Sequence, residues 1–163
     1  IWLTGGRGTG KSTVMESIVA NALGSPKGKL YAQGGSTEAG VRQSLKSDSI
    51  PIIFDEFETN GANREKIDSI IELFRQAWSQ TQGGILKGSA NGLAVQYNLS
   101  FCALVSSIRV GLENDADISR FSTLELELAD PQEWPALQKE FARITWEYGE
   151  GFLLVAVYIY RKS

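Results

Sequence analysis

The segment Gly5-Gly6-Arg7-Gly8-Thr9-Gly10-Lys11-Ser12 carries the required residue at each fixed position of the pattern G-x-x-x-x-G-K-[ST]. A short apolar run, residues 1–4, precedes it and is typical of a buried strand. The pattern that follows is typical of a helix that ends near Gly24 and Pro26, with apolar residues at Val14, Met15, Ile18, Val19 and Ala22. Strand, loop and helix in this order predict an α/β fold that begins with a phosphate-binding loop.

Each residue type in this loop suits the binding of a nucleoside triphosphate. Glycines let backbone N–H groups surround phosphate oxygens. The Lys11 ammonium is predicted to reach the β- and γ-phosphates and to act in catalysis, and the Ser12 hydroxyl is predicted to bind Mg²⁺. We therefore expect ATP and Mg²⁺ as ligands. The expected nucleotide contacts in this segment are Gly5, Gly6, Arg7, Gly8, Thr9, Gly10, Lys11, Ser12 and Thr13.

A second candidate motif is the apolar run from Ile50 to Phe54, which ends in Asp55 and Glu56. This is a Walker B pattern, in which Asp55 holds Mg²⁺ through its water shell. Glu56 is then placed to orient and deprotonate the attacking water, which favours hydrolysis over phosphoryl transfer to a small acceptor. The alternative is an acidic turn that merely follows a buried strand.

Two further candidates lie later in the chain. Ser106 and Ser107 end the apolar run that starts at Phe101, where a polar side chain could lie between the Walker carboxylates and the γ-phosphate. Ordinary turn chemistry is the alternative for these serines. Arg120 suits a transition-state clamp, because its guanidinium is planar and always charged. Its alternative is a local ion pair with a nearby acid, for which the candidates are Glu113, Asp115 and Asp117.

The remaining patterns predict a mostly parallel five-stranded sheet flanked by helices, with one inserted β-hairpin. The strands are expected at residues 1–4, 29–33, 50–54, 101–105 and 124–128, the last with one buried and one exposed face. Helices are expected at residues 37–46 and 67–78, and from residue 130 with Trp134, Leu137, Phe141 and Ile144 on one face. Asn91-Gly92 predicts the hairpin within residues 84–96. We expect residues 1–129 to form the core and residues 130–163 a C-terminal helical segment packed against it.

Composition excludes several classes of protein and of binding site. The 163 residues include no histidine and one cysteine, so a metal ion must be oxygen-liganded, as Mg²⁺ is. That cysteine, Cys102, is expected to be a small buried hydrophobe. The longest apolar run, residues 152–160, is about half of what a membrane-spanning helix needs. No secretory signal is evident, so we expect a cytoplasmic protein without membrane contact.

The order of these motifs resembles the ATPase part of phage and prophage primase-helicases. The resemblance covers nearly the whole chain and is carried by Asp55-Glu56-Phe57-Glu58, Ile71-Glu72-Leu73-Phe74-Arg75-Gln76-Ala77, Leu86-Lys87-Gly88-Ser89-Ala90-Asn91-Gly92, Ser106-Ser107-Ile108 and Ala116-Asp117-Ile118-Ser119-Arg120-Phe121. It implies a RecA-like AAA+ core related to superfamily III helicases, working in a bacterial host cytoplasm as a ring, expected to be a hexamer, on single-stranded DNA. In such rings the residue matching Arg120 completes the neighbouring subunit's site, and Lys87 of the hairpin contacts DNA in the central channel.

Other functions fit the same nucleotide-binding residues. An AAA+ ATPase that remodels a protein or loads another helicase would share all of them, and only the chemistry of the hairpin separates it from a DNA motor. A nucleotide-gated oligomerisation module is a further alternative, although Glu56 argues for turnover. A small-molecule kinase is disfavoured by the hairpin and by the late Arg120.

Overall fold

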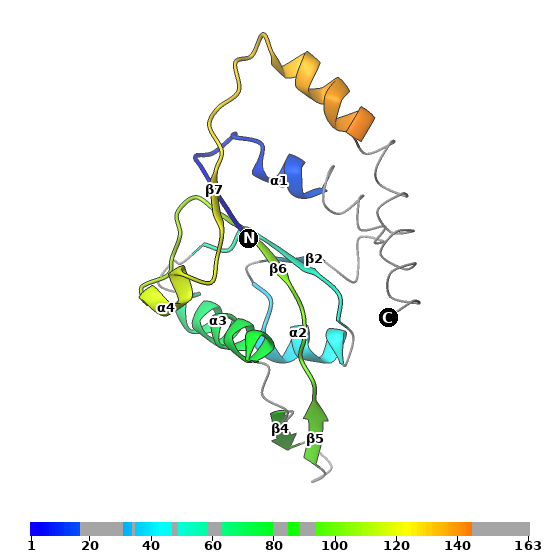
Figure 1. Cartoon of the computed structure of the whole chain (residues 1–163), viewed down its shortest axis with the longest axis vertical. Coiled ribbons are helices and arrows are strands. Elements are labelled where there is room, and N and C mark those ends of the chain that lie inside the picture. Colours follow the sequence, from blue (N-terminus) through cyan, green and yellow to red (C-terminus); the bar gives the residue numbers. More distant parts are fainter. Residues whose placement is uncertain are drawn as a thin grey trace.

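The computed structural model describes residues 1–16, 31–33, 35–46, 49–58, 63–79, 85–88 and 94–144 (Figure 1). In chain order the elements are β1 (Trp2–Thr4), α1 (Lys11–Thr13), β2 (Tyr31–Gln33), α2 (Glu38–Leu45), β3 (Ile52–Asp55), α3 (Arg64–Trp78), β4 (Ile85–Gly88), β5 (Ala94–Tyr97), β6 (Ala103–Ser107), α4 (Asp115–Ile118) and β7 (Thr123–Glu125). A further helix spans residues 134–144.

The main sheet has the strand order β2-β3-β6-β1-β7, and all of its pairings are parallel. The prediction of a mostly parallel five-stranded sheet is therefore confirmed. Parallel neighbours place their carboxyl ends at the same edge of the sheet. Because β6 lies between β1 and β3, the chain segments that leave these three strands start side by side at that edge.

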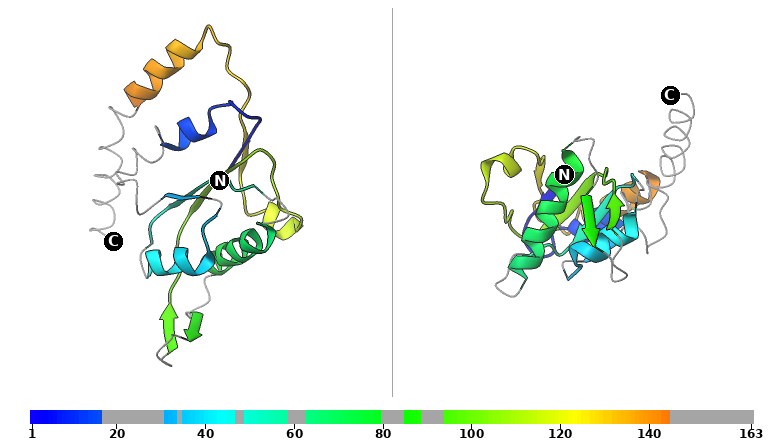
Figure 2. Two further views of the ribbon diagram at one scale, coloured as in Figure 1. Left: turned by 180° about the vertical axis from the view of Figure 1, so that it is seen from behind. Right: turned by 90° about the horizontal axis from the view of Figure 1, so that it is seen from below.

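Helices cover both faces of the sheet, with α1 on one side and α2 and α3 on the other (Figures 1 and 2). Successive side chains of a strand point to opposite faces, and the core divides accordingly. Trp2, Phe54 and Val105 belong to the larger cluster, which includes residues of α2 and α3. Leu3, Ile53 and Leu104, their neighbours in the chain, belong to the smaller cluster with Met15.

Three of the predicted helices are confirmed, at residues 38–45, 64–78 and 134–144. The Thr37 hydroxyl accepts a hydrogen bond from the Gly40 N–H at 3.2 Å and so caps α2. The apolar stripe of α3 buries Ile67, Ile70 and Phe74, as its spacing predicts. The helix expected after Asp130 is present at residues 134–144, where the Trp134 and Phe141 rings lie 6.4 Å apart.

The predicted hairpin is confirmed as an antiparallel pair of β4 and β5, in which Lys87 pairs with Val95. It projects from the end of the molecule opposite α1 (Figure 1). The Arg42 guanidinium of α2 lies 5.0 Å from the centroid of the Tyr97 ring and joins α2 to β5. The turn at Asn91-Gly92 lies outside the described residues. So do residues 17–24 of the first predicted helix, residues 29–30 of the second predicted strand and the apolar run 152–160. The boundary at residue 130 stays a prediction.

Two predictions of burial are wrong. Leu124 of β7 is 51% exposed, and Leu128 beyond it is 72% exposed, where an alternating buried face was expected. The reason is that β7 forms the outer edge of the sheet and contributes to neither core cluster of the described residues. Cys102 is exposed and lies directly before β6, outside the buried strand itself.

Candidate active site

The glycine-rich loop between β1 and α1 uses backbone conformations that favour glycine. Gly5 has φ +148°, and a Cβ there would lie 2.4 Å from the Leu126 carbonyl oxygen. Gly10, with φ +86°, is the N-cap of α1 in the left-handed region. The loop is therefore tightly packed against the chain beyond β7, and its shape depends on glycine at these positions.

Lys11 folds back over this loop. Its ammonium donates hydrogen bonds to the carbonyl oxygens of Gly5, at 2.6 Å, and Gly6, at 2.8 Å. The Thr9 hydroxyl also donates to the Gly6 carbonyl, at 3.0 Å. These contacts hold the cationic head at the mouth of the loop, where an anionic group would meet it.

A cavity of 610 Å³ lies beside this loop and within the size range of small-molecule sites. The segments that follow β1, β3 and β6 meet in it, as the order of the sheet requires. Its lining includes seven of the predicted site residues, namely Arg7, Gly8, Lys11, Ser12, Asp55, Glu56 and Ser106. Gly5, Gly6, Thr9, Gly10 and Thr13 belong to the same loop and first helical turn without lining the cavity.

Asp55 ends β3 and is held at both of its carboxylate oxygens. Oδ1 accepts hydrogen bonds from the Ser106 hydroxyl and from the Glu56 N–H, the latter at 3.0 Å. Oδ2 accepts one from the Tyr31 hydroxyl at 3.2 Å. Burial, and after it the nearby Asp55 carboxylate, raises the pKa of Tyr31 above its usual range, so the phenol stays protonated as a donor. Sequence reasoning missed Tyr31, because it lies on β2 and far from Asp55 in the chain.

Glu56 follows Asp55 with its side chain in the cavity and exposed. Its φ of +55° lies in the left-handed region, which costs a non-glycine residue about 1 to 2 kcal/mol. Within the described part of the chain, no hydrogen bond or ion pair engages its carboxylate. Strained backbone of this kind gathers at functional sites, where the surrounding structure enforces it. The position therefore directs a free carboxylate into the cavity.

A second glutamate, Glu58, also lines the cavity but has a different environment. Its carboxylate accepts a hydrogen bond from the Ile108 N–H, which ties the loop after β3 to the loop after β6. Sequence reasoning did not single out Glu58. Its carboxylate is committed to the backbone, whereas that of Glu56 is not.

Ser106 and Ser107 have separate roles, which the sequence left open. Adjacent residues of a strand point to opposite faces, and only Ser106 lines the cavity. The Ser107 hydroxyl accepts a hydrogen bond from the Trp2 indole N–H at 2.6 Å and donates one to the Arg109 carbonyl at 2.6 Å. Ser107, predicted as a nucleotide contact, does not line the cavity and joins β6 to Trp2 of β1.

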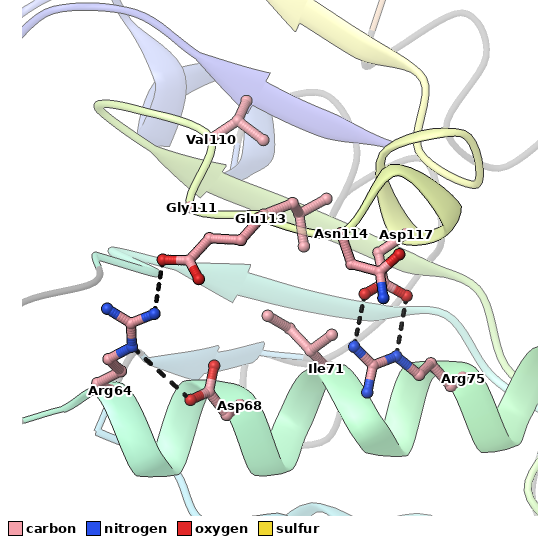
Figure 3. A pocket seen from close by; sticks show the side chains of 10 residues that line it. Arg64, Asp68, Ile71, Arg75, Val110, Gly111, Glu113, Asn114 and Asp117 are labelled. Carbon is pink, nitrogen blue, oxygen red and sulfur yellow. Dashed lines mark hydrogen bonds and ion pairs between the residues drawn. The ribbon is translucent and has the colours of Figure 1, made fainter.

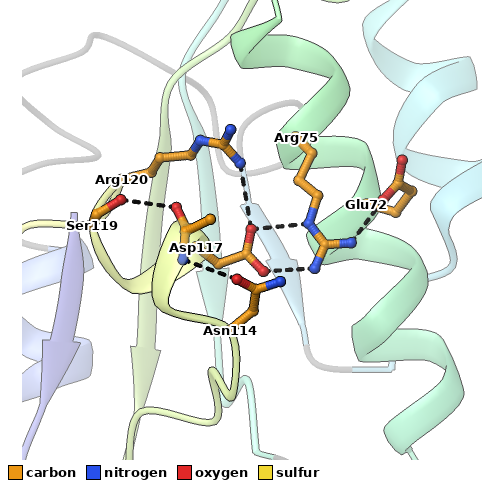
Figure 4. Close-up of polar contacts among 7 residues, drawn as sticks. Glu72, Arg75, Asn114, Asp117, Ser119 and Arg120 are labelled. Carbon is orange, nitrogen blue, oxygen red and sulfur yellow. Dashed lines mark hydrogen bonds and ion pairs between the residues drawn. The ribbon is translucent and has the colours of Figure 1, made fainter.

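Arg120 does not line the cavity and lies in a separate cluster with Asp117 and Arg75 (Figure 4). Asp117 is buried and accepts hydrogen bonds from Arg75 at Nε, 2.9 Å, and at Nη2, 2.6 Å. Arg120 Nη1 lies 3.5 Å from Asp117, and its guanidinium lies 6.0 Å from the centroid of the Trp78 ring. The local ion pair considered as an alternative for Arg120 is present, while its side chain remains 47% exposed.

The Arg75–Asp117 pair is expected to stabilise the fold in a pH-dependent way. The hydrogen bonds from Arg75 hold the pKa of the Asp117 carboxyl below its usual range. Its stabilisation is therefore present above about pH 4, the unfolded value, and is lost as the pH falls through the lower folded value. Asp117→Asn should lower the free energy of unfolding at pH 7 by about 1 to 3 kcal/mol, measured by urea denaturation.

Measuring the free energy of unfolding at two pH values separates the contribution of the Asp117 charge from that of its packing. The difference between wild type and Asp117→Asn should shrink at pH 3, because this pH lies below the unfolded value of the carboxyl and the stabilisation from its lowered pKa declines there. Asp115→Asn, an exposed carboxylate on the same helix, serves as the matched control and should change stability by less than about 0.5 kcal/mol. An equal loss at both pH values would show that packing, not the ion pair, carries the effect.

A second cavity, of 540 Å³, lies between α3 and the loop before α4 (Figure 3). Its arginines already face acids, since Arg64 Nη2 lies 2.5 Å from Glu113 and Arg75 contacts Asp117. Val110 and Ile71 supply the apolar part of the lining. Because both cations in the lining are paired within the chain, this cavity offers no unpaired charge to an anionic ligand.

The cavity beside the glycine-rich loop has the donors that a hard cation prefers. Ser12 and Asp55 both line it and carry side-chain oxygen atoms. Within the described ranges, no cluster of three or more histidine, cysteine, aspartate or glutamate side chains could hold a metal ion alone. Mg²⁺ rarely needs such a cluster, since it is commonly held by one or two carboxylates together with phosphate oxygens and water. These residues therefore fit Mg²⁺ that arrives with a nucleotide.

No helix in the described part of the chain has the length and apolar character needed to cross a membrane. Lys87, the predicted nucleic-acid contact, is placed on β4 of the hairpin, away from the cavity. Comparison with known proteins gives no further assignment, because neither a protein-family model nor a curated protein matches this sequence.

Proposed function

We propose that this chain is a Mg-ATP-binding and ATP-hydrolysing motor domain, the helicase module of a phage-type DNA replication protein that acts on single-stranded DNA. One observation carries the ATPase part of this proposal. A lysine-bearing glycine loop, the Asp55–Glu56 pair and Ser106 come from three neighbouring parallel strands and converge on one cavity. The convergence of these groups is what phosphoryl transfer to water requires, since catalysis there depends on positioning and electrostatics.

In this proposal the binding residues act before the chemical step. Lys11 exchanges its contacts with the Gly5 and Gly6 carbonyls for the β- and γ-phosphate oxygens, and loop N–H groups surround the phosphates. Ser12 and Asp55 would hold Mg²⁺. When bound, the ion neutralises part of the negative charge on the phosphate oxygens. Ser106, which donates a hydrogen bond to Asp55, would also contact the γ-phosphate.

Glu56 is the proposed general base. Its carboxylate accepts a proton from water as the water oxygen bonds to the γ-phosphorus and the bond from that phosphorus to the β–γ bridging oxygen breaks. The products are ADP and inorganic phosphate. The free carboxylate and the enforced left-handed backbone of Glu56 support this role, because they point an unengaged acceptor into the cavity.

The proposed coupling to DNA rests on the continuity of the chain. The hairpin strand β5 leads within a few residues into β6, and Ser106, the residue before the last of β6, lines the cavity. A force on the hairpin, where Lys87 is the proposed phosphate contact, would thus reach the cavity through one buried strand. Arg120 is proposed to act in a neighbouring subunit of a ring, which agrees with its exposure and with its absence from the lining of this chain's own cavity.

Steady-state ATP hydrolysis, measured with and without single-stranded DNA at low salt, tests this function. We expect hydrolysis that single-stranded DNA stimulates about fivefold or more, the lower range of coupling between two sites. The stimulation should weaken with added salt, because phosphate contacts are electrostatic. Hydrolysis that ignores DNA would contradict the helicase assignment and favour a protein-remodelling ATPase. Binding of ATP without turnover would instead favour a nucleotide-gated oligomerisation module.

A further inference from the structure

Tyr31 belongs to no motif of the sequence, yet its hydroxyl donates to Asp55 Oδ2 at 3.2 Å. The opposite oxygen, Oδ1, accepts from Ser106 and from the Glu56 N–H. We propose that Tyr31 is a positioning residue which, together with Ser106, fixes the rotation of the Asp55 carboxylate so that it can hold nucleotide-bound Mg²⁺. This inference rests on the proposed ATPase function and adds a residue to its metal site.

The position of the Tyr31 hydroxyl is set by the sheet. In the parallel pairing of β2 and β3, Tyr31 lies opposite Ile53, and Gln33 lies opposite Asp55. Tyr31 therefore shares a face with Ile53 and Asp55, and its long ring reaches along that face to the carboxylate. A smaller polar side chain at the same position would be too short to make this contact.

The ring itself is anchored by packing. Tyr31 is partly buried against the smaller core cluster, in which Leu3 comes from β1 and Met15 from the segment after α1. The same cluster therefore supports the strand before the glycine-rich loop and the ring that holds Asp55. Apolar contacts therefore fix the position of the phenol oxygen relative to the glycine-rich loop, whereas a surface side chain would be free to move.

Asp55 would contact Mg²⁺, either directly or through a water molecule, with carboxylate lone pairs that its hydrogen bonds do not use. The direction of these lone pairs therefore matters. A carboxylate that rotates freely samples orientations in which those lone pairs point away from the ion. Groups that orient a metal ligand through hydrogen bonds typically change metal affinity by about 10-fold to 100-fold when they are removed. Tyr31→Phe removes only the hydroxyl and keeps the packing of the ring.

The test measures Mg²⁺ dependence instead of turnover. ADP binding is followed by calorimetry over a range of Mg²⁺ concentrations and in EDTA, and Mn²⁺ binding to the protein–ADP complex is followed by electron paramagnetic resonance. For Tyr31→Phe we expect the Mg²⁺ concentration at half-saturation to rise about tenfold, with ADP affinity in EDTA unchanged. The Mn²⁺ affinity should fall by the same factor.

Tyr97→Phe is the matched control, because it removes a phenol that lies on β5 beside Arg42 and outside the cavity. It should leave the Mg²⁺ midpoint unchanged. Ser106→Ala and the double variant Tyr31→Phe with Ser106→Ala add a further check. Because both hydroxyls hold the same carboxylate, the two losses should not add independently.

The possible outcomes test the positioning role of Tyr31 separately from the proposed ATPase function. An unchanged Mg²⁺ midpoint in Tyr31→Phe would overturn the positioning role. So would a loss of ADP affinity in EDTA as large as the loss with Mg²⁺. In both cases, binding of ADP with Mg²⁺ by wild type would leave the proposed function intact. Failure of wild type to bind ADP with Mg²⁺ would overturn both. A lowered melting temperature with an unchanged midpoint would assign Tyr31 a purely structural role.

Discussion

Glu56→Gln is expected to lower kcat for ATP hydrolysis by about 10²-fold to 10⁴-fold, the range that a positioned general base contributes. The amide keeps the size of the side chain and adopts the same backbone, but it accepts no proton from water. The affinity for ATP should change little, because the phosphates are held by the loop and Lys11. Single-turnover hydrolysis and equilibrium ATP binding, measured on the same preparation, check both expectations.

Glu58→Gln is the matched control for Glu56→Gln. Glu58 lines the same cavity, but its carboxylate accepts a hydrogen bond from the Ile108 N–H, which an amide oxygen can also accept. Its effect on kcat should be less than about tenfold, well below the contribution of a general base. If Glu58→Gln abolished hydrolysis while Glu56→Gln did not, the base would be Glu58. If neither variant reduced turnover, both carboxylates would lose the role.

Lys11→Ala is expected to weaken ATP binding by about a hundredfold, equivalent to about 3 kcal/mol. The ammonium is the cation that the loop holds at the edge of the cavity, through the Gly5 and Gly6 carbonyls. Without it, the phosphate oxygens lose a charge-assisted partner. Calorimetric titration with ATP and Mg²⁺ measures the affinity, and thermal unfolding with added ATP should show a smaller stabilisation than in wild type.

Lys66→Ala controls for the loss of a positive charge, because Lys66 is exposed on α3. Its ATP affinity should match that of wild type. Unfolding of Lys11→Ala without nucleotide must also be measured, since the lysine stabilises the loop through two carbonyls. Unchanged ATP affinity in Lys11→Ala would contradict the assignment of this loop to phosphate binding.

The parts of the fold that the sequence predicted depend on local patterns. The apolar runs at Trp2–Thr4 and Ile52–Asp55 form strands, and the stripe of α3 faces the core, because spacing alone decides which side chains can be buried together. The hairpin of β4 and β5 was predicted from another local signal, the Asn91-Gly92 pair between two short extended runs. The loop from Gly5 to Ser12 could be recognised because its fixed positions lie next to one another in the chain.

The candidate site was predictable only in part. Asp55 and Glu56 were found because they end a strand, yet Tyr31 and Glu58 were not, since their contacts depend on strand order and on two distant loops. The sequence also left Ser106 and Ser107 equivalent. Which of the two faces the cavity depends on the phase of β6 between its neighbours, and a shift of one residue would exchange them.

The sequence pattern did not predict which side chains are exposed at the edge of the sheet. The alternation of Leu124 and Leu128 with glutamates predicts a buried face. Among the described strands, however, β7 pairs with β1 alone, and Leu124 in it and Leu128 beyond it are exposed. Cys102 is exposed and precedes β6, which begins at Ala103, two residues after the start of the predicted strand. In both cases the position within the sheet, not the residue type, determines what water can reach.

The sequence by itself determined the class of fold, the glycine-rich loop and the carboxylates at the end of β3, because each is encoded by residues close together in the chain. Only the tertiary structure decided that β6 lies between β1 and β3. It also decided that Tyr31 and Ser106 donate hydrogen bonds to the two carboxylate oxygens of Asp55. Finally, it placed Arg120 beside Asp117 and outside the lining of the cavity. These relations join segments far apart in sequence. They arise from the order and register of parallel strands, which the burial of two core layers selects.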